Sequence, residues 1–206
     1  NKKFEYIKRD RLFGNASVRY QFNDWLNAMV RVGQDYFSRP VEFNRPTGSR
    51  NLPATVSGFN GNYYQSSNTF RELNYDFLIN ANRSFGKFGI DLIVGGNQMN
   101  QINSGMSTFV NNFFVRDLYT IGNGQIKTPD QSYFQKKVNS FYGSAGLSYN
   151  DLLFLNITAR NDWFSTLNPS SNNYLYPSVS TSFVFTEALS GKPSWLNYGK
   201  IRAAYA

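Results

Sequence analysis

The feature that most constrains the fold is a strict alternation of apolar and polar residues that reverses through a very short turn and then resumes. Side chains on a β-strand point alternately to the two faces of a sheet, so this period of two gives one apolar and one polar face. After Asn23, Asp24 and Trp25, the same alternation continues through residues 26–32. We therefore expect an antiparallel hairpin whose first strand places these residues on its apolar face: Leu12, Gly14, Ala16, Val18, Tyr20 and Phe22.

Two further hairpins repeat this arrangement. A three-residue loop at residues 150–152 would pair Tyr149 with Leu153, and a two-residue type II′ turn at Gly86-Lys87 would pair Phe85 with Phe88. In each register, every apolar position stays on one side of the sheet. The three hairpins therefore predict a single apolar face that continues from strand to strand.

The connections between the predicted strands alternate in length. Turns of two or three residues alternate with long connections at residues 38–69, 100–135 and 164–174. Outer-membrane barrels have short turns on the periplasmic rim and long loops outside, and their strands need about 9–11 residues to cross the bilayer. We predict about eight strands, at residues 11–22, 26–36, 71–85, 88–99, 136–149, 153–163, 175–185 and 198–206.

The composition supports a membrane barrel and disfavours several other classes. Only 41% of residues are hydrophobic, as expected when half of each strand faces water, and 17% are aromatic, as expected for interfacial girdles. Histidine and cysteine are absent, which removes the commonest general base and metal ligands, so we expect neither an enzyme nor a metal or other cofactor. The net charge of +8 is scattered along the chain, which favours an anionic outer leaflet with lipopolysaccharide over nucleic acid as the partner.

The predicted register gives the charged strand residues a structural role on the polar, inward face. Asp91 would lie opposite Asn82, and Asp76 opposite Asn97, as ordinary polar wall. We expect the inward arginines to be hydrated, to pair with Asp35 or Asp162, or to contact a plug; they are Arg19, Arg31, Arg160 and Arg202.

The candidate substrate contacts lie in two places. Trp163 ends a strand that we interpret as inward-facing, where its ring beside Arg160 and Asp162 could stack on a solute and hydrogen-bond it. Tyr63 and Tyr64 lie in a predicted long loop, among Asn, Ser and Gly, a mixture suited to sugars or peptides.

One stretch, from Leu155 to Glu187, closely resembles a known family. It carries Arg-Asn-Asp-Trp at a strand end, then Ser-Thr-Leu in a loop, then Tyr-Pro-Ser at residues 176–178. These phrases resemble the barrel of SusC/RagA-type TonB-dependent transporters, the outer-membrane nutrient importers typical of Bacteroidetes. Residues 11–33 and 195–206 resemble other parts of that barrel, whereas the long loops hardly do.

The resemblance implies more than this chain contains. Family members have a roughly 22-stranded barrel filled by a plug, a segment that engages the TonB complex, and a SusD-like lipoprotein lid. Because the chain starts in a basic polar segment and ends within a predicted strand, we expect residues 1–206 to be part of such a barrel, importing glycans or peptides. A small passive porin and a soluble all-β glycan-binding module remain the alternatives; a detergent requirement and the length of the parent chain would discriminate them.

Overall fold

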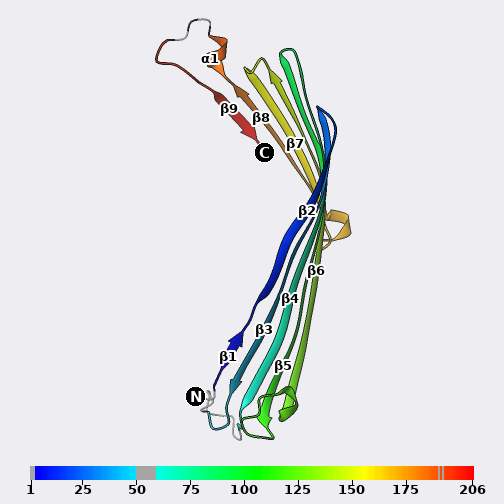
Figure 1. The fold of residues 1–206 in the computed structure, drawn as a ribbon, viewed down its shortest axis with the longest axis vertical. Helices are drawn as coiled ribbons and strands as arrows, with labels where there is room; N and C mark the ends of the chain where they lie inside the picture. Colours follow the sequence, from blue (N-terminus) through cyan, green and yellow to red (C-terminus); the bar gives the residue numbers. More distant parts are fainter. Residues whose placement is uncertain (1–2, 50–58, 190, 192) are drawn as a thin grey trace. The chain divides into compact units, whose positions relative to one another are not determined.

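The computed structural model describes residues 3–49, 59–189, 191 and 193–206, which form one antiparallel sheet (Figure 1). Its strand order is β1-β3-β4-β5-β6-β7-β8-β9, with β2 also paired to β3. From β2 onward each strand therefore pairs with its neighbours in the sequence. The described strands do not close into a barrel, since β9 ends the order opposite to β1 and β2.

The strands are β1 (Glu5–Ile7), β2 (Asp10–Asn23), β3 (Leu26–Arg45), β4 (Asn62–Phe85), β5 (Phe88–Phe113), β6 (Gly124–Tyr149), β7 (Leu153–Phe164), β8 (Asn173–Phe183) and β9 (Ile201–Tyr205). Short helical turns occur at η1 (Ile121–Asn123), η2 (Pro169–Ser171) and α1 (Phe185–Ala188). No helix among the described residues combines the length and the apolar character needed to cross a membrane.

The all-β prediction is confirmed, whereas the predicted bounds of several strands are wrong. The described residues form nine strands, because residues 5–7, expected to belong to a polar first segment, pair with β3 from Glu5↔Phe43 to Ile7↔Val41. The described residues of the connections expected at 38–69 and 100–135 are largely strand. The backbone hydrogen-bond ladder does not require apolar residues, so these strands continue after the alternation has ended.

The chain divides into two compact units, described here separately. Unit 1 comprises residues 1–14, 34–72 and 101–135, and unit 2 comprises residues 15–33, 73–100 and 136–206. The three predicted short turns and the strands β7 to β9 belong to unit 2, and the ends of the longest strands belong to unit 1.

The short turns of unit 2 have the predicted geometry. Tyr149 pairs with Leu153, and Asn150 and Asp151 adopt positive φ angles of 52° and 56°, which their short polar side chains tolerate. Gly86 has a φ of 59°, as a glycine-first two-residue hairpin requires. The predicted phase between neighbouring strands is therefore confirmed for β6 and β7.

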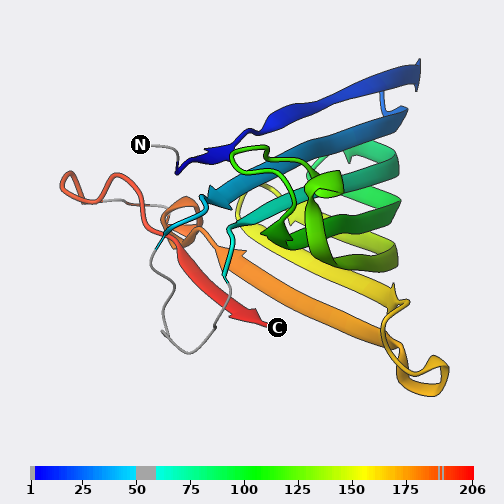
Figure 2. The ribbon, with the colours of Figure 1, turned by 90° about the horizontal axis from the view of Figure 1, so that it is seen from below.

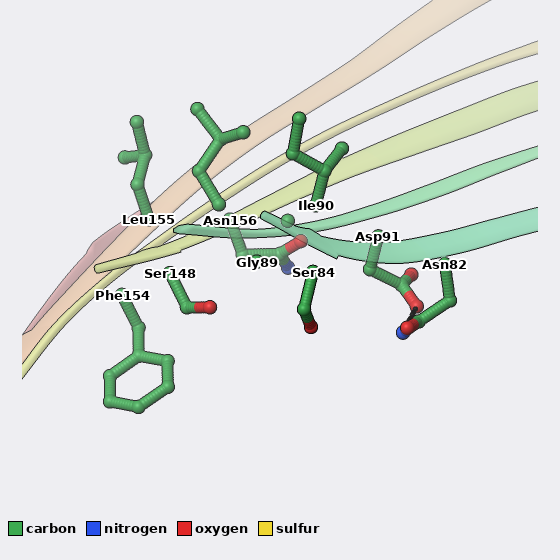
Figure 3. Close-up of a pocket in the computed structure, with 11 residues that line it drawn as sticks. Asn82, Ser84, Gly89, Ile90, Asp91, Ser148, Phe154, Leu155 and Asn156 are labelled. Carbon is green, nitrogen blue, oxygen red and sulfur yellow. Dashed lines mark hydrogen bonds between the residues drawn. The ribbon is translucent and has the colours of Figure 1, made fainter. Parts of the chain in front are cut away.

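Unit 2 has one apolar and one polar face, as the alternation predicts. Figure 3 shows the two directions at one position, with Ile90 and Leu155 on one side of the sheet and Ser148, Phe154 and Asp91 on the other. The predicted apolar residues are well exposed: Val18 68%, Val30 57%, Ile79 45%, Leu92 44%, Leu147 45% and Ile157 48%. We call this side of unit 2 the apolar face and the opposite side the polar face.

The connection between β8 and β9 differs from the other turns on its rim. It spans residues 184–200 and contains α1, which is why β8 ends two residues earlier than predicted (Figures 1 and 2). Thr186 is fully buried, and its hydroxyl accepts a hydrogen bond from the Gly199 amide at 3.1 Å. A Cβ added at Gly199 would lie 2.1 Å from the Phe185 ring, so only glycine fits at this position. Packing and hydrogen bonding therefore hold together the residues near the two ends of this connection.

Unit 1 contains a hydrophobic cluster of buried residues. Tyr63, Val110 and Phe113 are 5%, 0% and 1% exposed, and the half-buried Tyr119 packs against them. Gly61 has a φ of 89°, and a Cβ there would lie 2.5 Å from the Phe113 ring. The cluster therefore requires glycine at this position for two independent reasons.

Candidate functional site

The most organised group of charged side chains lies on the polar face of unit 2, where β6 and β7 pair. The register places Tyr142 opposite Arg160 and Ser140 opposite Asp162, so all four side chains share one face. Arg160 donates from Nε to Asp162 Oδ1 at 2.7 Å and from Nη2 to Ser140 Oγ at 2.8 Å. Its guanidinium also lies 5.6 Å from the centre of the Tyr142 ring. Arg160 is thus fixed from three directions.

The same network extends along the polar face toward β3. Arg31 donates to Asp76 at 2.9 Å, and Asn97 donates to the other oxygen of Asp76 at 2.8 Å. A Cβ at Gly95 would lie 2.7 Å from the Tyr142 ring, so only glycine leaves enough space for that ring. We call these eight residues the polar network: Arg31, Asp76, Gly95, Asn97, Ser140, Tyr142, Arg160 and Asp162.

Within each ion pair of the polar network, the carboxylate is the more buried partner. The side chains of Asp76 and Asp162 are 12% and 13% exposed, whereas those of Arg31 and Arg160 are 48% and 45% exposed. An arginine has five N–H donors in a planar fork. The two side-chain bonds of Arg160 found among the described residues use Nε and Nη2, and neither uses Nη1. The network therefore offers fixed cationic donors and holds its acids beneath them.

A hollow lined by polar and apolar residues lies next to this network on the same face (Figure 3). Its volume is about 300 Å³, and Asn82 donates to Asp91 within it at 2.9 Å. This bond confirms the predicted pairing of Asp91 with Asn82, as the Asn97 bond confirms that of Asp76. The adjoining part of the face carries Lys200, whose ammonium lies 4.8 Å from the centre of the Phe154 ring.

The ion pairs agree only in part with the predicted ones. Arg160 pairs with Asp162 as expected. Asp35, however, is paired in unit 1 with Arg11, by two bonds of 2.9 and 2.7 Å, and Arg31 pairs with Asp76. Sequence alone could not select these partners, because several arginines share the inward parity.

The placement of Trp163 beside Arg160 and Asp162 is wrong. Trp163 pairs with Asn139, one position away from the Ser140↔Asp162 pair, so alternation turns it to the apolar face. On that face Asn139 accepts a hydrogen bond from Gln98 at 2.9 Å. The run Arg-Asn-Asp-Trp thus contributes to both faces: Arg160 and Asp162 to the polar one, Trp163 to the other.

The two tyrosine candidates, Tyr63 and Tyr64, lie in different environments. Tyr63 belongs to the buried cluster of unit 1, so its expected exposure to a solute is wrong. Burial and the neighbouring Glu42 carboxylate, to which its hydroxyl hydrogen-bonds, raise the pKa of Tyr63 to about 12. Tyr64 is half-buried and stacks on Phe43, with ring centres 4.8 Å apart and Phe109 nearby at 6.2 Å. Only Tyr64 remains available for contact with a solute.

Several members of the polar network were not singled out by the sequence reasoning. Ser140, Tyr142 and Gly95 lie at alternating positions that are predicted to face inward. Many other residues share this property, so it does not single out these three. A glycine directly across the strand pair from an aromatic residue is a signal that could have identified Gly95 and Tyr142. Among residues 3–49, 59–189, 191 and 193–206, no group of three or more acidic, histidine or cysteine side chains is placed to bind a metal ion.

Comparison with solved structures finds proteins that contain a similar fold. A chain of the RagAB peptide importer in its open-open state matches with a TM-score of 0.88 and 12% identity, over 98% of this chain and 22% of that chain. The closed-closed state gives a TM-score of 0.88 at 12% identity, over 98% of this chain and 23% of the other. A RagAB peptide transporter structure gives 0.84 at 12% identity, over 97% and 23%.

These matches establish the fold and its extent. No family model and no curated protein matches the sequence. The chain spans less than a quarter of the length of each matched chain. It has the fold of an open, antiparallel segment of a β-barrel wall.

Proposed function

We propose that this chain forms part of the wall of a TonB-dependent outer-membrane importer of the SusC/RagA type. In this proposal the apolar face of unit 2 contacts lipid, the polar face lines the interior, and the short turns face the periplasm. The TonB complex would act through other parts of a longer protein, and a SusD-like lipoprotein would cover the outer mouth.

The observation that carries the proposal is the contrast between the two faces of unit 2. Large apolar side chains are exposed along one face, at levels such as 68% for Val18, which suits hydrocarbon as the solvent. The opposite face holds the ion pairs of the polar network. The similarity in fold to RagAB chains supports this reading of the sheet as barrel wall.

We propose peptides as the imported solute. The exposed guanidinium groups of Arg31 and Arg160 match carboxylates, which every free peptide carries at its C-terminus. The described part of the polar network has no exposed acidic platform of the kind that binds sugar hydroxyl groups. The structural neighbours are peptide importers, which supports the same choice.

The test uses the parent protein in its native cells, with uptake of a labelled peptide mixture as the readout. Gly95→Ala should slow uptake, because the added methyl group displaces Tyr142 and so removes one of the three contacts that fix Arg160. Gly146→Ala is the matched control, since its Cβ would make ordinary contact at 3.4 Å on the same face. Equal uptake by both variants would remove the polar network from the solute path.

The alternatives give different outcomes in simple experiments. A passive porin would conduct small ions in planar bilayers without an energised inner membrane, whereas the proposed importer requires one. A soluble glycan-binding module would purify without detergent and bind sugars. Uptake of oligosaccharides in place of peptides would retain the importer and replace its substrate class.

A further inference from the structure

The apolar face of unit 2 contains a groove near the rim of short turns. The groove has a volume of about 440 Å³ and lies across β5, β6, β7 and β8. Figure 3 shows two of its side chains, Ile90 and Leu155, on the side of the sheet opposite to Ser148 and Asp91. The groove is lined mainly by Phe88, Ile90, Leu147, Tyr149, Leu153 and Leu155.

The groove lies in the middle of the strand order. Each of the strands that line it, β5 to β8, is paired on both sides, and the free edges of the sheet are at β1, β2 and β9. Further strands of a longer parent would pair with those edges, since the backbone groups of the inner strands are already used. The groove therefore stays on the outer surface in the complete wall.

A cation, Arg83, lies on β4, the strand next to this groove. The hairpin at Gly86-Lys87 pairs Phe85 with Phe88, so Arg83 lies opposite Ile90 on the apolar face. The Arg83 guanidinium lies 5.0 Å from the centre of the Phe85 ring and 5.7 Å from that of Trp25. These rings hold the charge by cation–π contact without neutralising it, so it remains available to an anion.

Hydrocarbon and phosphate are the two chemistries that this arrangement matches. An acyl chain fills an apolar groove at no cost in unpaired polar groups, and basic residues near aromatic rings at the interface bind lipid headgroups. We propose that the groove and Arg83 form a binding site for one glycerophospholipid, with an acyl chain along Ile90, Leu147 and Leu155 and the phosphate on Arg83. The site rests on the proposed function only in requiring that the apolar face contact lipid.

A glycerophospholipid fits this site better than lipopolysaccharide does. The site lies at the rim of short turns, which face the periplasm in the proposed orientation, and phospholipid lines that side of the outer membrane. Apart from Ser148, Thr181 and the hydroxyl of Tyr149, the groove is lined by apolar side chains and glycine, so sugar hydroxyl groups would find few partners in it.

The experiment is native mass spectrometry of the parent protein purified in mild detergent. The unaltered protein should retain one phospholipid mass, and Arg83→Gln should lower its occupancy about tenfold, the effect of losing roughly 1.4 kcal/mol of interaction. Arg83→Lys should restore part of the occupancy. Arg19→Gln is the matched control, because Arg19 is an exposed arginine on the polar face of β2 and should not affect the lipid.

A second variant tests the groove without touching the charge. Ile90→Phe fills the space for the acyl chain and should also lower lipid occupancy while peptide uptake persists. Equal lipid retention by Arg83→Gln and the unaltered protein, a bound mass of lipopolysaccharide, or no retained lipid would each overturn the site. Peptide uptake that continues in those cases leaves the proposed function standing, whereas a parent that purifies without detergent overturns both.

Discussion

The two units of this sheet differ in how much their apolar side chains are exposed to solvent. In unit 1, Tyr63, Val110 and Phe113 are almost fully buried against one another, as in a protein surrounded by water. In unit 2, side chains of similar size such as Val18 and Ile157 are 68% and 48% exposed at alternating positions. The comparison teaches that the same set of strands can bury apolar side chains against one another in one unit and leave them exposed at alternating positions in the other.

The largest expected effect tests the buried cluster of unit 1. Phe113→Ala should destabilise unit 1 by roughly 3–5 kcal/mol, because it leaves a cavity where the ring was 1% exposed. The adjacent Phe114 is 66% exposed, so Phe114→Ala should have little effect. Hydrogen exchange of the unit 1 amides in the parent protein measures both. Equal exchange in the two variants would mean that unit 1 has no core of this kind.

The next effect tests the apolar face of unit 2. Ile157→Arg should cost about 2–4 kcal/mol if the residue lies near the bilayer midplane. Asn156→Arg places the same side chain one residue away on the polar face and should cost far less. Guanidinium unfolding of the parent protein in lipid vesicles reports the difference. A larger loss for Asn156→Arg would show that the two faces are assigned the wrong way round.

A smaller effect tests the turn that sets the phase of β4 and β5. Gly86→Ala should cost about 1–2 kcal/mol, the strain of a side chain in the left-handed region, because the φ of Gly86 is 59°. A Cβ at Gly86 or at Gly14 would meet no atom within 4 Å, so Gly14→Ala is a control in which only the backbone strain is missing. The same unfolding measurement applies. Equal costs would indicate that the turn is not held in this conformation.

The smallest effect is a titration in unit 1. The pKa of Tyr63 is about 12, above the ordinary value of 10.0, so the neutral phenol favours the folded state. Its contribution to stability is complete below pH 10 and is lost as the pH rises through 12. Difference absorbance between the parent protein and Tyr63→Phe should show one tyrosine ionising near pH 12. A component that ionises near 10 would place Tyr63 in contact with water.

The sequence predicts unit 2 well because two independent constraints act there. Alternation defines the faces, and turn residues such as Gly86 and Asn150 define where each strand reverses, so the Tyr149↔Leu153 pair could be predicted. Most of unit 1 lacks the first constraint, and its strand residues within 38–69 and 101–135 were predicted to be loops. Local patterns carry no information on how far a backbone ladder extends beyond its apolar residues.

The candidate site was predicted in part for a related reason. Parity placed Arg160 and Asp162 on the polar face, and their 2.7 Å bond confirms it. The same parity, applied to Trp163, would have placed it on the other face, and the expectation failed where it relied on closeness in sequence. Tyr63 and Tyr64 are neighbours that alternation also separates, one into the buried cluster and the other into an aromatic stack.

The order of the strands also bears on how such a wall assembles. Every strand after β2 pairs with the strand that precedes it in the chain, so each new hairpin finds its partner already in place. Loop closure between chain neighbours costs little entropy compared with pairing between distant segments. The pairing of β1 with β3, across Glu5↔Phe43, is the step that must wait for residues beyond the first hairpin. Growth of the sheet can therefore proceed in one direction along the chain, with a single growing edge exposed at each stage.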